Sequence, residues 1–238
     1  MGTFTGQMAV ITGGSRGIGK AIALKLAAKG AALCLIGRNL ERLEETARQS
    51  RALVRLYQTD LAIPSELESL VGRLDAELER LDILVHSAGV YANAAFTDAP
   101  LEELDRLYAV NVRAPFRLTQ GLLPTLIKTQ GQVVFINSRV VLQAAPRLTH
   151  YAATKHALRS LADSLREEVS ELGVRVVSIY PGRTAGAIQE WLFQLENRPY
   201  QPERLMQPEN IADIACHALS QPRTVDLTDI YTRPFLKS

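Results

Sequence analysis

The sequence predicts an α/β fold: a doubly wound parallel sheet of about seven strands with helices on both faces. Two observations predict it. Short β-rich runs alternate with amphipathic helical stretches along the whole chain, and this alternation is typical of parallel strands joined by helical crossovers. Several of the runs are apolar without a polar residue at every second position, as expected of strands covered on both faces.

The expected elements follow one another in regular order. The strand candidates are residues 8–12, 32–36, 53–57, 83–86, 133–137, 174–179 and 227–231. Helical spacing of apolar residues predicts helices over 17–29, 39–50, 65–80, 101–128, 151–172 and 208–220. Because crossovers between parallel strands are right-handed, the carboxyl ends of all the strands should meet at one edge of the sheet.

Length and composition indicate one Rossmann-type domain over residues 1–238. The chain is 47% hydrophobic and 22% charged, and its net charge of +2 is too small to indicate nucleic acid or an anionic membrane as a partner. No stretch approaches the roughly 18 apolar residues of a membrane span, and no signal-peptide pattern opens the chain. We therefore expect a cytoplasmic protein, in which Cys34 and Cys216 are buried thiols and no metal is bound.

One long irregular stretch, over about residues 183–206, interrupts this pattern. It contains Trp191, the only tryptophan, together with Phe193 and Tyr200. A segment of this length within a compact domain is usually functional or mobile. We interpret it as a lid over the substrate, the alternative being a merely structural excursion.

A glycine-rich turn follows the first predicted strand and opens the first predicted helix. Gly13, Gly17 and Gly19 let the backbone turn tightly and approach a pyrophosphate, and the helix start offers free N–H groups. The spacing is G-x-x-x-G-x-G rather than G-x-G-x-x-G, and a helix-entry loop without a ligand would look the same. The strand-to-helix context favours a dinucleotide site.

The end of the second strand bears on the choice of dinucleotide. A protein that binds NAD usually has Asp or Glu there for the ribose hydroxyls. This chain has Arg38, with no carboxylate before Glu41, and Arg16 lies in the glycine turn. Since guanidinium groups suit a 2′-phosphate, the sequence favours NADP(H) over NAD. The alternative is that Arg38 is merely solvated.

One face of the helix predicted over 151–172 carries a stripe of side chains that begins with a tyrosine and a lysine. Steps of three and four residues place seven side chains on this stripe: Tyr151, Lys155, Leu158, Ala162, Leu165, Val169 and Leu172. The apolar members should pack on the sheet, which leaves Tyr151 and Lys155 at the edge where ligands bind. Ser138 follows the strand at 133–137 and reaches the same edge, although a serine there is commonly a turn residue.

These three side chains suit the transfer of a proton to or from a carbonyl oxygen. A tyrosine with a pKa of about 10 is a poor base at neutral pH, and a nearby ammonium favours tyrosinate. We expect Lys155 to lower the pKa of Tyr151, which then acts as general acid and base. We expect Ser138 to hydrogen-bond the carbonyl oxygen and polarise it.

With these residues placed, the chain resembles the short-chain dehydrogenase/reductase family, in its compact single-domain branch. The family motifs appear as Thr12–Gly19, Asp60-Leu61, the altered segment His86-Ser87-Ala88-Gly89, Asn111, Ser138, Tyr151, Lys155 and Pro181-Gly182. The resemblance implies a contact from Asp60 to adenine, a bond from Lys155 to the nicotinamide ribose, and a water at Asn111 that links Lys155 to a proton relay. Asp60 as a turn cap and Asn111 as a helix-kink residue are the simpler alternatives.

The residue patterns and the family resemblance together predict two sets of site residues. The catalytic set is Ser138, Tyr151, Lys155 and Asn111. The cofactor-binding set is Gly13, Ser15, Arg16, Gly17, Ile18, Gly19, Arg38, Asp60, Leu61, Ala88, Gly89, Tyr151, Lys155, Pro181, Gly182 and Thr184.

The departures from the family pattern leave several points open. His86 and Ser87 replace two asparagines, and Arg139 adds a cation beside Ser138. Gly186 stands at the position of the family threonine that contacts nicotinamide, with Thr184 close by. The resemblance implies a homodimer or a homotetramer. Because the usual glycine-rich ending is missing, the sequence does not decide between the two.

The sequence predicts an NADP(H)-dependent oxidoreductase that interconverts a carbonyl and a secondary alcohol. The alternative is an NADP(H)-sensing binding protein with little or no catalysis. An epimerase or dehydratase of the longer branch would need more chain at the carboxyl end. The substrate stays open among hydroxy acids, small ketones, acyl thioesters and steroid-like alcohols, and Arg139 or Arg183 would attract an acidic group if either faces the pocket.

Overall fold

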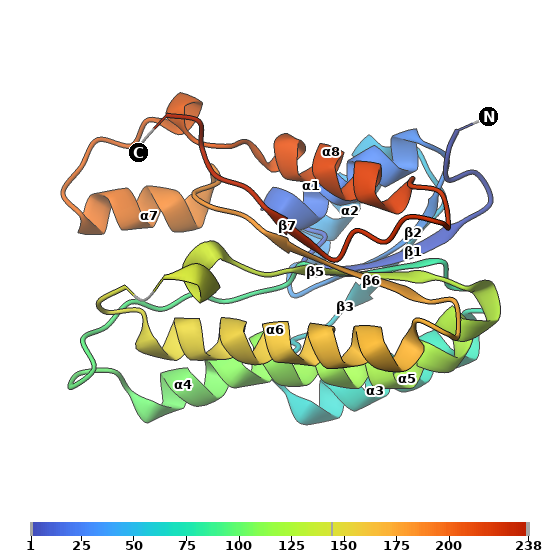
Figure 1. The fold of residues 1–238 in the computed structure, drawn as a ribbon, viewed down its shortest axis with the longest axis horizontal. Coiled ribbons are helices and arrows are strands. Elements are labelled where there is room, and N and C mark those ends of the chain that lie inside the picture. Colours follow the sequence, from blue (N-terminus) through green and yellow to red (C-terminus); the bar gives the residue numbers. More distant parts are fainter. Residues whose placement is uncertain (1, 144, 237–238) are drawn as a thin grey trace.

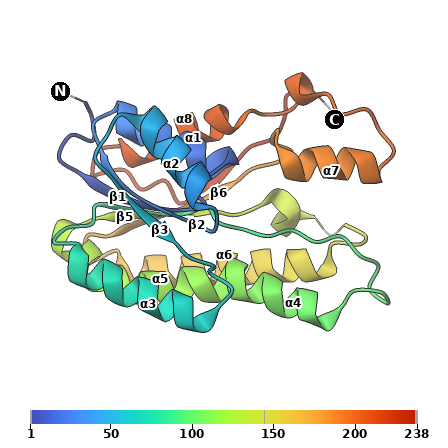
Figure 2. The same ribbon diagram turned by 180° about the vertical axis from the view of Figure 1, so that it is seen from behind.

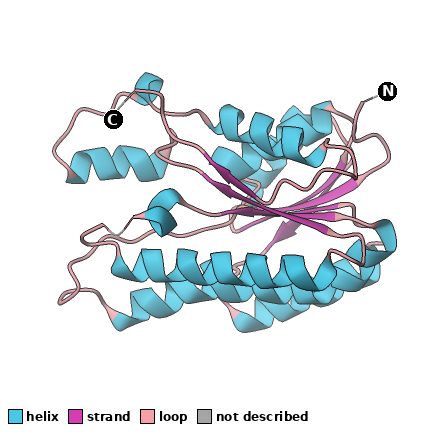
Figure 3. Ribbon diagram, viewed as in Figure 1, coloured by secondary structure: helices cyan, strands magenta, loops and turns pink. Residues whose placement is uncertain are grey.

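A parallel sheet forms the middle layer of the computed structural model, which describes residues 2–143 and 145–236 (Figures 1 and 3). Its strands are β1 Met8–Thr12, β2 Ala32–Gly37, β3 Val54–Gln58, β4 Ile83–His86, β5 Gln132–Ile136, β6 Arg175–Tyr180 and β7 Asp229–Tyr231. Within the described ranges the sheet has seven strands in the order β3-β2-β1-β4-β5-β6-β7. Every pairing is parallel. The predicted fold class is confirmed, and the strand order reverses between β1 and β4, where such sheets bind ligands.

Two helical layers cover the sheet (Figures 1 and 2). One face carries α1 Gly17–Ala28, α2 Leu40–Ser50 and α8 Pro208–Leu219; the other carries α3 Pro64–Glu77, α4 Leu101–Tyr108, α5 Ala114–Thr129 and α6 Thr149–Val169. Each face has its own apolar core. Ile22 and Ile211 belong to the first cluster, and Leu118 and Leu158 to the second. Burial on both faces explains why the strand sequences are apolar without alternation.

Local chemistry sets the helix starts. The Asn39 side chain accepts a hydrogen bond from the Arg42 N–H at 2.8 Å and so caps α2. Pro64 and Pro208 are the first residues of α3 and α8, a position where the missing N–H costs nothing. The observed helices therefore begin within a few residues of the predicted ones.

The helix predicted over 101–128 is not a uniform α-helix. Between α4 and α5 the chain makes a π-helical turn, Ala109–Arg113, with Asn111 buried at its centre. Such turns occur often at functional sites, and the spacing of apolar residues did not indicate this one. The predicted stripe of α6 also ends too late, because the helix stops at Val169 and Leu172 is exposed.

The stretch over 183–206 is not wholly irregular either. It contains α7, Ala187–Leu195, and a short 3₁₀ turn, Pro202–Arg204. In Figure 1, α7 lies to the left of the sheet, beyond the carboxyl ends of the strands. The helix has only nine residues, which is too short for its apolar spacing to stand out from the sequence.

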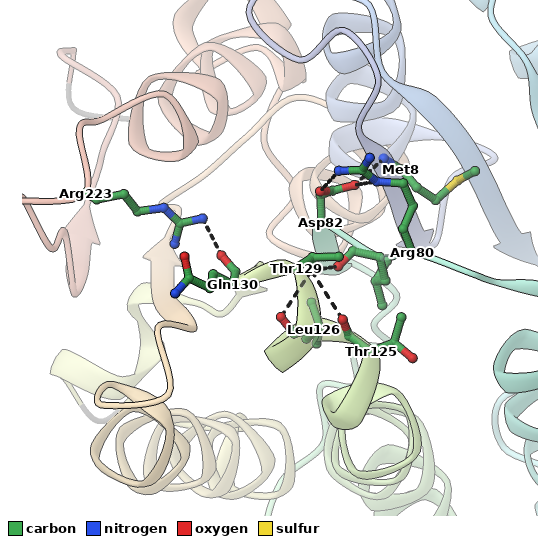
Figure 4. Close-up of polar contacts among 9 residues, drawn as sticks. Met8, Arg80, Asp82, Thr125, Leu126, Thr129, Gln130 and Arg223 are labelled. Carbon is green, nitrogen blue, oxygen red and sulfur yellow. Dashed lines mark hydrogen bonds and ion pairs between the residues drawn. The ribbon is translucent and has the colours of Figure 1, made fainter.

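Polar contacts hold the opposite, amino-terminal edge of the sheet (Figure 4). The Asp82 carboxylate accepts from the Met8 N–H at 2.8 Å and from the Arg80 guanidinium at 2.7 Å. The Arg223 guanidinium donates to the Gln130 carbonyl oxygen. These contacts fix the strand starts, and the predicted site residues lie at the other edge.

The remaining predictions concern the thiols and the membrane. Cys34 and Cys216 are free and buried, as predicted. Of the residues that the structure describes, no helix combines the length and the apolar composition needed to cross a bilayer.

Candidate active site

The glycine turn packs directly against the segment that follows β4. The Thr12 hydroxyl accepts from the N–H groups of Ser87 and Ala88, both at 3.1 Å. Gly13 has a φ of +72°, and a Cβ added to it would lie 2.9 Å from the Ala88 nitrogen. Only glycine fits here, because the backbone is left-handed and the neighbouring chain is too close for a side chain.

A cavity of about 540 Å³ runs along the carboxyl edge of the sheet, from the glycine turn to the start of α7. Twelve of the predicted cofactor-binding residues line it: Gly13, Ser15, Arg16, Gly17, Ile18, Gly19, Arg38, Asp60, Leu61, Ala88, Gly89 and Thr184. The other four, Tyr151, Lys155, Pro181 and Gly182, do not line it. A Cβ at Gly182 would face the backbone of Thr232 and Arg233 at 3.2 Å, so this turn lies against the C-terminal segment.

One end of the cavity is basic. Arg16 and Arg38 line it as predicted, together with Arg42, which the sequence analysis did not select. The Asn39 cap starts α2 so that Arg42 falls in its first turn. An asparagine at this helix start is the sequence feature that could have indicated Arg42. An Arg38 nitrogen lies 4.0 Å from an Asp60 carboxylate oxygen. Asp60 also accepts from the Ala62 N–H at 2.9 Å, so it caps the turn as well as lining the cavity.

This cavity fits a dinucleotide. Its size is within the usual range for ligand pockets, the glycine turn leaves backbone accessible at the start of α1, and four arginines, Arg16, Arg38, Arg42 and Arg106, line it. Among the described residues, no three His, Cys, Asp or Glu side chains gather in a way that would hold a metal ion.

Ser138, Tyr151 and Lys155 meet beside this cavity. Ser138 follows β5, and Tyr151 and Lys155 lie in the first two turns of α6. The Lys155 ammonium donates to the Ile136 carbonyl oxygen at 3.1 Å and lies 6.0 Å from the centre of the Tyr151 ring. Ile136 lines the cavity, and a Cβ at Gly89 would be 3.8 Å from the Lys155 nitrogen. These three side chains therefore adjoin the cavity.

Burial dominates the ionisation of this pair. It raises the pKa of Tyr151 to about 12, although a hydrogen bond with Ser138 acts in the opposite direction. Burial also lowers the pKa of Lys155 to about 8. The expected lowering of the tyrosine pKa by Lys155 is not present in this structure. Below pH 8, Tyr151 is a neutral phenol and Lys155 is mostly charged.

Asn111 connects the segment after β4 to the helix that carries Tyr151. Its side chain accepts from the Val90 N–H at 2.9 Å and donates to the Val90 carbonyl at 3.0 Å. It also donates to the Thr154 hydroxyl at 3.1 Å, which in turn donates to the Tyr151 carbonyl at 2.8 Å. The side-chain amide is thus engaged by protein groups. The water relay at Asn111 stays a prediction.

His86, which replaces the first family asparagine, is held in the core through one ring nitrogen, and its Nδ1 is buried without a hydrogen-bond partner. The His86 Nε2 lies 2.8 Å from the Thr119 hydroxyl, and its ring stacks on Phe135 with centroids 4.9 Å apart. Burial lowers the pKa of His86 to about 3, so the ring is neutral. A stacked aromatic pair thus stands where the family pattern has an amide.

The two arginines considered for an acidic substrate differ in their surroundings. Arg183 forms an ion pair with Glu196 at 2.5 Å, and its guanidinium lies 5.1 Å from the centre of the Phe193 ring. Its charge is therefore used within the segment that carries α7. Arg139 comes directly after Ser138 and is half-buried. Its backbone N–H donates to the Pro181 carbonyl at 3.2 Å.

Comparison with known proteins gives consistent matches. The family model described as short chain dehydrogenase matches residues 7–196. An uncharacterized oxidoreductase of Staphylococcus aureus (strain USA300) is 33% identical over 238 residues, covering 98% of this chain and 100% of that protein. A metagenomic short-chain oxidoreductase solved in complex with NADP has a TM-score of 0.84 and 29% identity, with 99% of this chain and 100% of that chain covered. An NAD⁺-bound xylitol dehydrogenase has a TM-score of 0.86 and 21% identity over 97% of this chain and 99% of that one, which shows a shared fold.

Proposed function

Because the chain belongs to the short chain dehydrogenase family, we propose that it is an NADP(H)-dependent oxidoreductase that interconverts a carbonyl and a secondary alcohol by hydride transfer. The observation that carries this proposal is the meeting of Ser138, Tyr151 and Lys155 beside a cavity lined by the glycine turn. A phenol, an ammonium and a hydroxyl there are the groups that a carbonyl oxygen needs as it gains or loses a proton.

The nicotinamide ring of the bound cofactor would supply or accept the hydride. Tyr151 would donate the proton to the developing alkoxide in the reducing direction and remove it in the oxidising one. Its raised pKa keeps the phenol protonated at neutral pH, which suits the donor role. Lys155 would hold the nicotinamide ribose, and Ser138 would polarise the carbonyl.

The basic end of the cavity supports NADP(H) as the cofactor. Arg16, Arg38 and Arg42 all line it, and planar guanidinium donors suit a 2′-phosphate. The metagenomic relative was solved with NADP, whereas a protein with the same fold was solved with NAD⁺. Since the fold accommodates both cofactors, it is the arginines of this chain that favour NADP(H) over NAD.

Substituting Tyr151 separates this proposal from the alternative of an NADP(H)-sensing protein. We expect the wild-type protein to oxidise NADPH with at least one member of a carbonyl panel. Tyr151→Phe should lose at least about 100-fold in kcat, a typical contribution from general acid catalysis, while NADPH raises its melting temperature as in wild type. Tyr231→Phe, which removes a hydroxyl from β7, should retain full activity.

The possible outcomes assign the function. Full activity in a folded Tyr151→Phe protein would overturn the mechanism. Tight NADPH binding without turnover of any carbonyl by the wild-type protein would favour the sensing alternative.

A further inference from the structure

Two aromatic side chains from distant segments extend outward from the ring of Tyr151: Tyr91 contacts Tyr151, and Trp191 contacts Tyr91. Tyr91, in the loop after β4, has its ring centre 4.6 Å from that of Tyr151, with an interplanar angle of 51°. Trp191, on α7, has its ring centre 6.1 Å from that of Tyr91, in an edge-on arrangement at 74°. These separations are in the range of favourable aromatic contacts. The loop and α7 thus meet over the proposed proton donor.

The Tyr91 ring is held from both sides along the chain. The preceding residue, Val90, has its N–H and its carbonyl both bonded to Asn111. Two residues after Tyr91, the Asn93 side chain accepts from Arg147 at 2.9 Å, which holds the chain on that side. A ring anchored in this way is preorganised for contact with a ligand, because little freedom remains to be lost on binding.

Trp191 belongs to an apolar stripe that the fold leaves uncovered. Ile188, Trp191 and Leu195 follow steps of three and four residues along α7, and their side chains are 43%, 44% and 49% exposed. The opposite face of α7 is packed at Phe193, and Leu192, at the margin of the stripe, is also buried. An amphipathic helix normally turns its apolar side inward.

The stripe runs along the site. Ile188 lines the cofactor cavity, and Trp191, one turn later, contacts Tyr91. Exposed apolar surface beside polar catalytic groups is typical of a ligand-binding groove. The occupant must lie between the cofactor cavity and Tyr91, which is where the substrate of the proposed reaction would sit.

We infer that Tyr91 and Trp191 form an aromatic slot that selects substrates carrying a flat aromatic group next to the reacting carbonyl. The inference rests on the proposed function. A flat ring placed against Tyr91 and Trp191 would make edge and face contacts with both and would cover the exposed stripe. Of the three arginines in the stretch over 183–206, Arg183 and Arg198 both pair with Glu196, so neither of these two guanidinium groups is without a carboxylate partner.

The test compares acetophenone with cyclohexyl methyl ketone, which has similar size without a flat ring. The quantity to follow is the ratio of kcat/KM for the two ketones, since a ratio between variants removes the difference in intrinsic reactivity. Tyr91→Leu and Trp191→Leu should each lower this ratio about three- to tenfold, the equivalent of one lost aromatic contact. Tyr91→Phe keeps the ring and should keep the ratio.

Phe96→Leu is the matched control. Phe96 lies in the same loop and is 80% exposed, and no ring contact joins it to Tyr151 among the described residues. Its replacement should leave the ratio unchanged.

Fluorescence gives a second readout that needs no turnover. Trp191 is the only tryptophan in the chain, so its emission reports on the slot directly. With saturating NADP⁺, which cannot reduce a ketone, acetophenone should quench the emission of the wild-type protein saturably and at lower concentration than cyclohexyl methyl ketone. Trp191→Leu should abolish the signal, and Tyr91→Leu should weaken the acetophenone affinity.

The aromatic slot and the proposed function are overturned by different results. If the wild-type protein reduces no member of the carbonyl panel, the proposed function fails. If it reduces other carbonyls but neither of these two ketones, the slot is overturned. If both ketones are reduced but the ratio is the same in all variants, or both quench equally, the aromatic slot is overturned and the proposed function stands. Preference of the wild-type protein for an aliphatic 2-keto acid over acetophenone also overturns the slot, and would point to Arg139.

Discussion

The side-chain amide of Asn137 donates to the backbone carbonyl oxygen of Lys155 at 3.2 Å, joining the end of β5 to α6. The oxygen of the same amide accepts from the Ser138 N–H at 2.8 Å. Asn137 is buried, and it follows the last strand residue before Ser138. One buried amide thus sets the distance between the serine and the lysine of the candidate site.

Asn137→Ala should separate these two groups. The substitution removes one bond to the Lys155 carbonyl and leaves the Ser138 N–H without its partner, which we expect to lower the free energy of unfolding by about 1–3 kcal/mol. We also expect kcat to fall at least about tenfold with little change in NADPH affinity, because the cavity walls stay in place. Urea unfolding, steady-state kinetics and NADPH titration check these expectations.

Asn210→Ala serves as the comparison for Asn137→Ala. Asn210 accepts from the Gln207 N–H at 2.8 Å in the cap of α8, so its loss should cost about 1 kcal/mol and leave kcat unchanged. A folded Asn137→Ala protein with wild-type kcat would show that Asn137 does not position the site.

The two glycines of the turn after β1 should respond differently to an added methyl group. Both have positive φ, +72° at Gly13 and +54° at Gly17, so alanine costs about 1–2 kcal/mol at either position. At Gly13 the Cβ also meets the Ala88 backbone at 2.9 Å, whereas at Gly17 nothing lies within 4 Å. Gly13→Ala should therefore lose more stability than Gly17→Ala.

Gly17→Ala should still lose cofactor affinity, because Gly17 lines the cavity and its new Cβ points into open space. Melting temperatures with and without NADPH separate the two effects: a lower value without ligand for Gly13→Ala, and a smaller NADPH-induced rise for Gly17→Ala. Equal stability of the two variants would contradict the close packing of Gly13 on Ala88.

Features encoded by neighbouring residues could be predicted from the sequence. The strands read as apolar runs because both faces are buried, and the glycine turn reads as a motif because the backbone must bend at Gly13. Tyr151 and Lys155 stand out because they begin a stripe whose later members, such as Leu158 and Ala162, are buried against the sheet.

Features that depend on contacts between distant segments could not be predicted. The π-turn contains Asn111, whose side chain bonds Val90, about twenty residues earlier in the chain. The contact of Tyr91 with Tyr151 requires the loop after β4 to reach α6. The raised pKa of Tyr151 follows from burial, whereas a motif indicates only which charges lie nearby.

Burial of Lys155 should make stability depend on pH. Its pKa is about 8 in the folded chain against an ordinary value of 10.5. The unfolded chain therefore binds more protons between these values, and stability rises with pH across this window. Below pH 8 the full penalty applies, and from pH 7 to pH 10 the gain should be about 2–3 kcal/mol.

Lys155→Met removes the titrating group and with it this gain in stability. The measurement is the free energy of unfolding of both proteins as a function of pH. The difference in unfolding free energy between wild type and Lys155→Met should shift by that amount in favour of wild type from pH 7 to pH 10. Both proteins keep Tyr151, whose raised pKa lowers stability above pH 10 because the unfolded phenol ionises first, and this shared effect cancels in the difference. Parallel pH profiles for the two proteins would mean that Lys155 is not desolvated.

The guanidinium groups at the basic end of the cavity should distinguish NADPH from NADH. The Arg38 side chain is 60% exposed, so its contact with a 2′-phosphate is worth the lower part of the usual range for charged hydrogen bonds, about 1.5 kcal/mol or tenfold in Kd. Arg38→Ala should weaken NADPH by about that factor and change NADH by less than about threefold. Arg42→Ala should act in the same direction, and added salt should weaken NADPH more than NADH.

Arg48→Ala provides the control for these titrations. Arg48 also lies on α2, but it pairs with Glu44 at 3.9 Å and does not line the cavity, so neither cofactor should respond to its loss. Kd values from calorimetry for both cofactors decide the question. If Arg38→Ala weakens NADPH and NADH by the same factor, the arginine serves a part that the two cofactors share, and the preference for NADP(H) has no basis in Arg38.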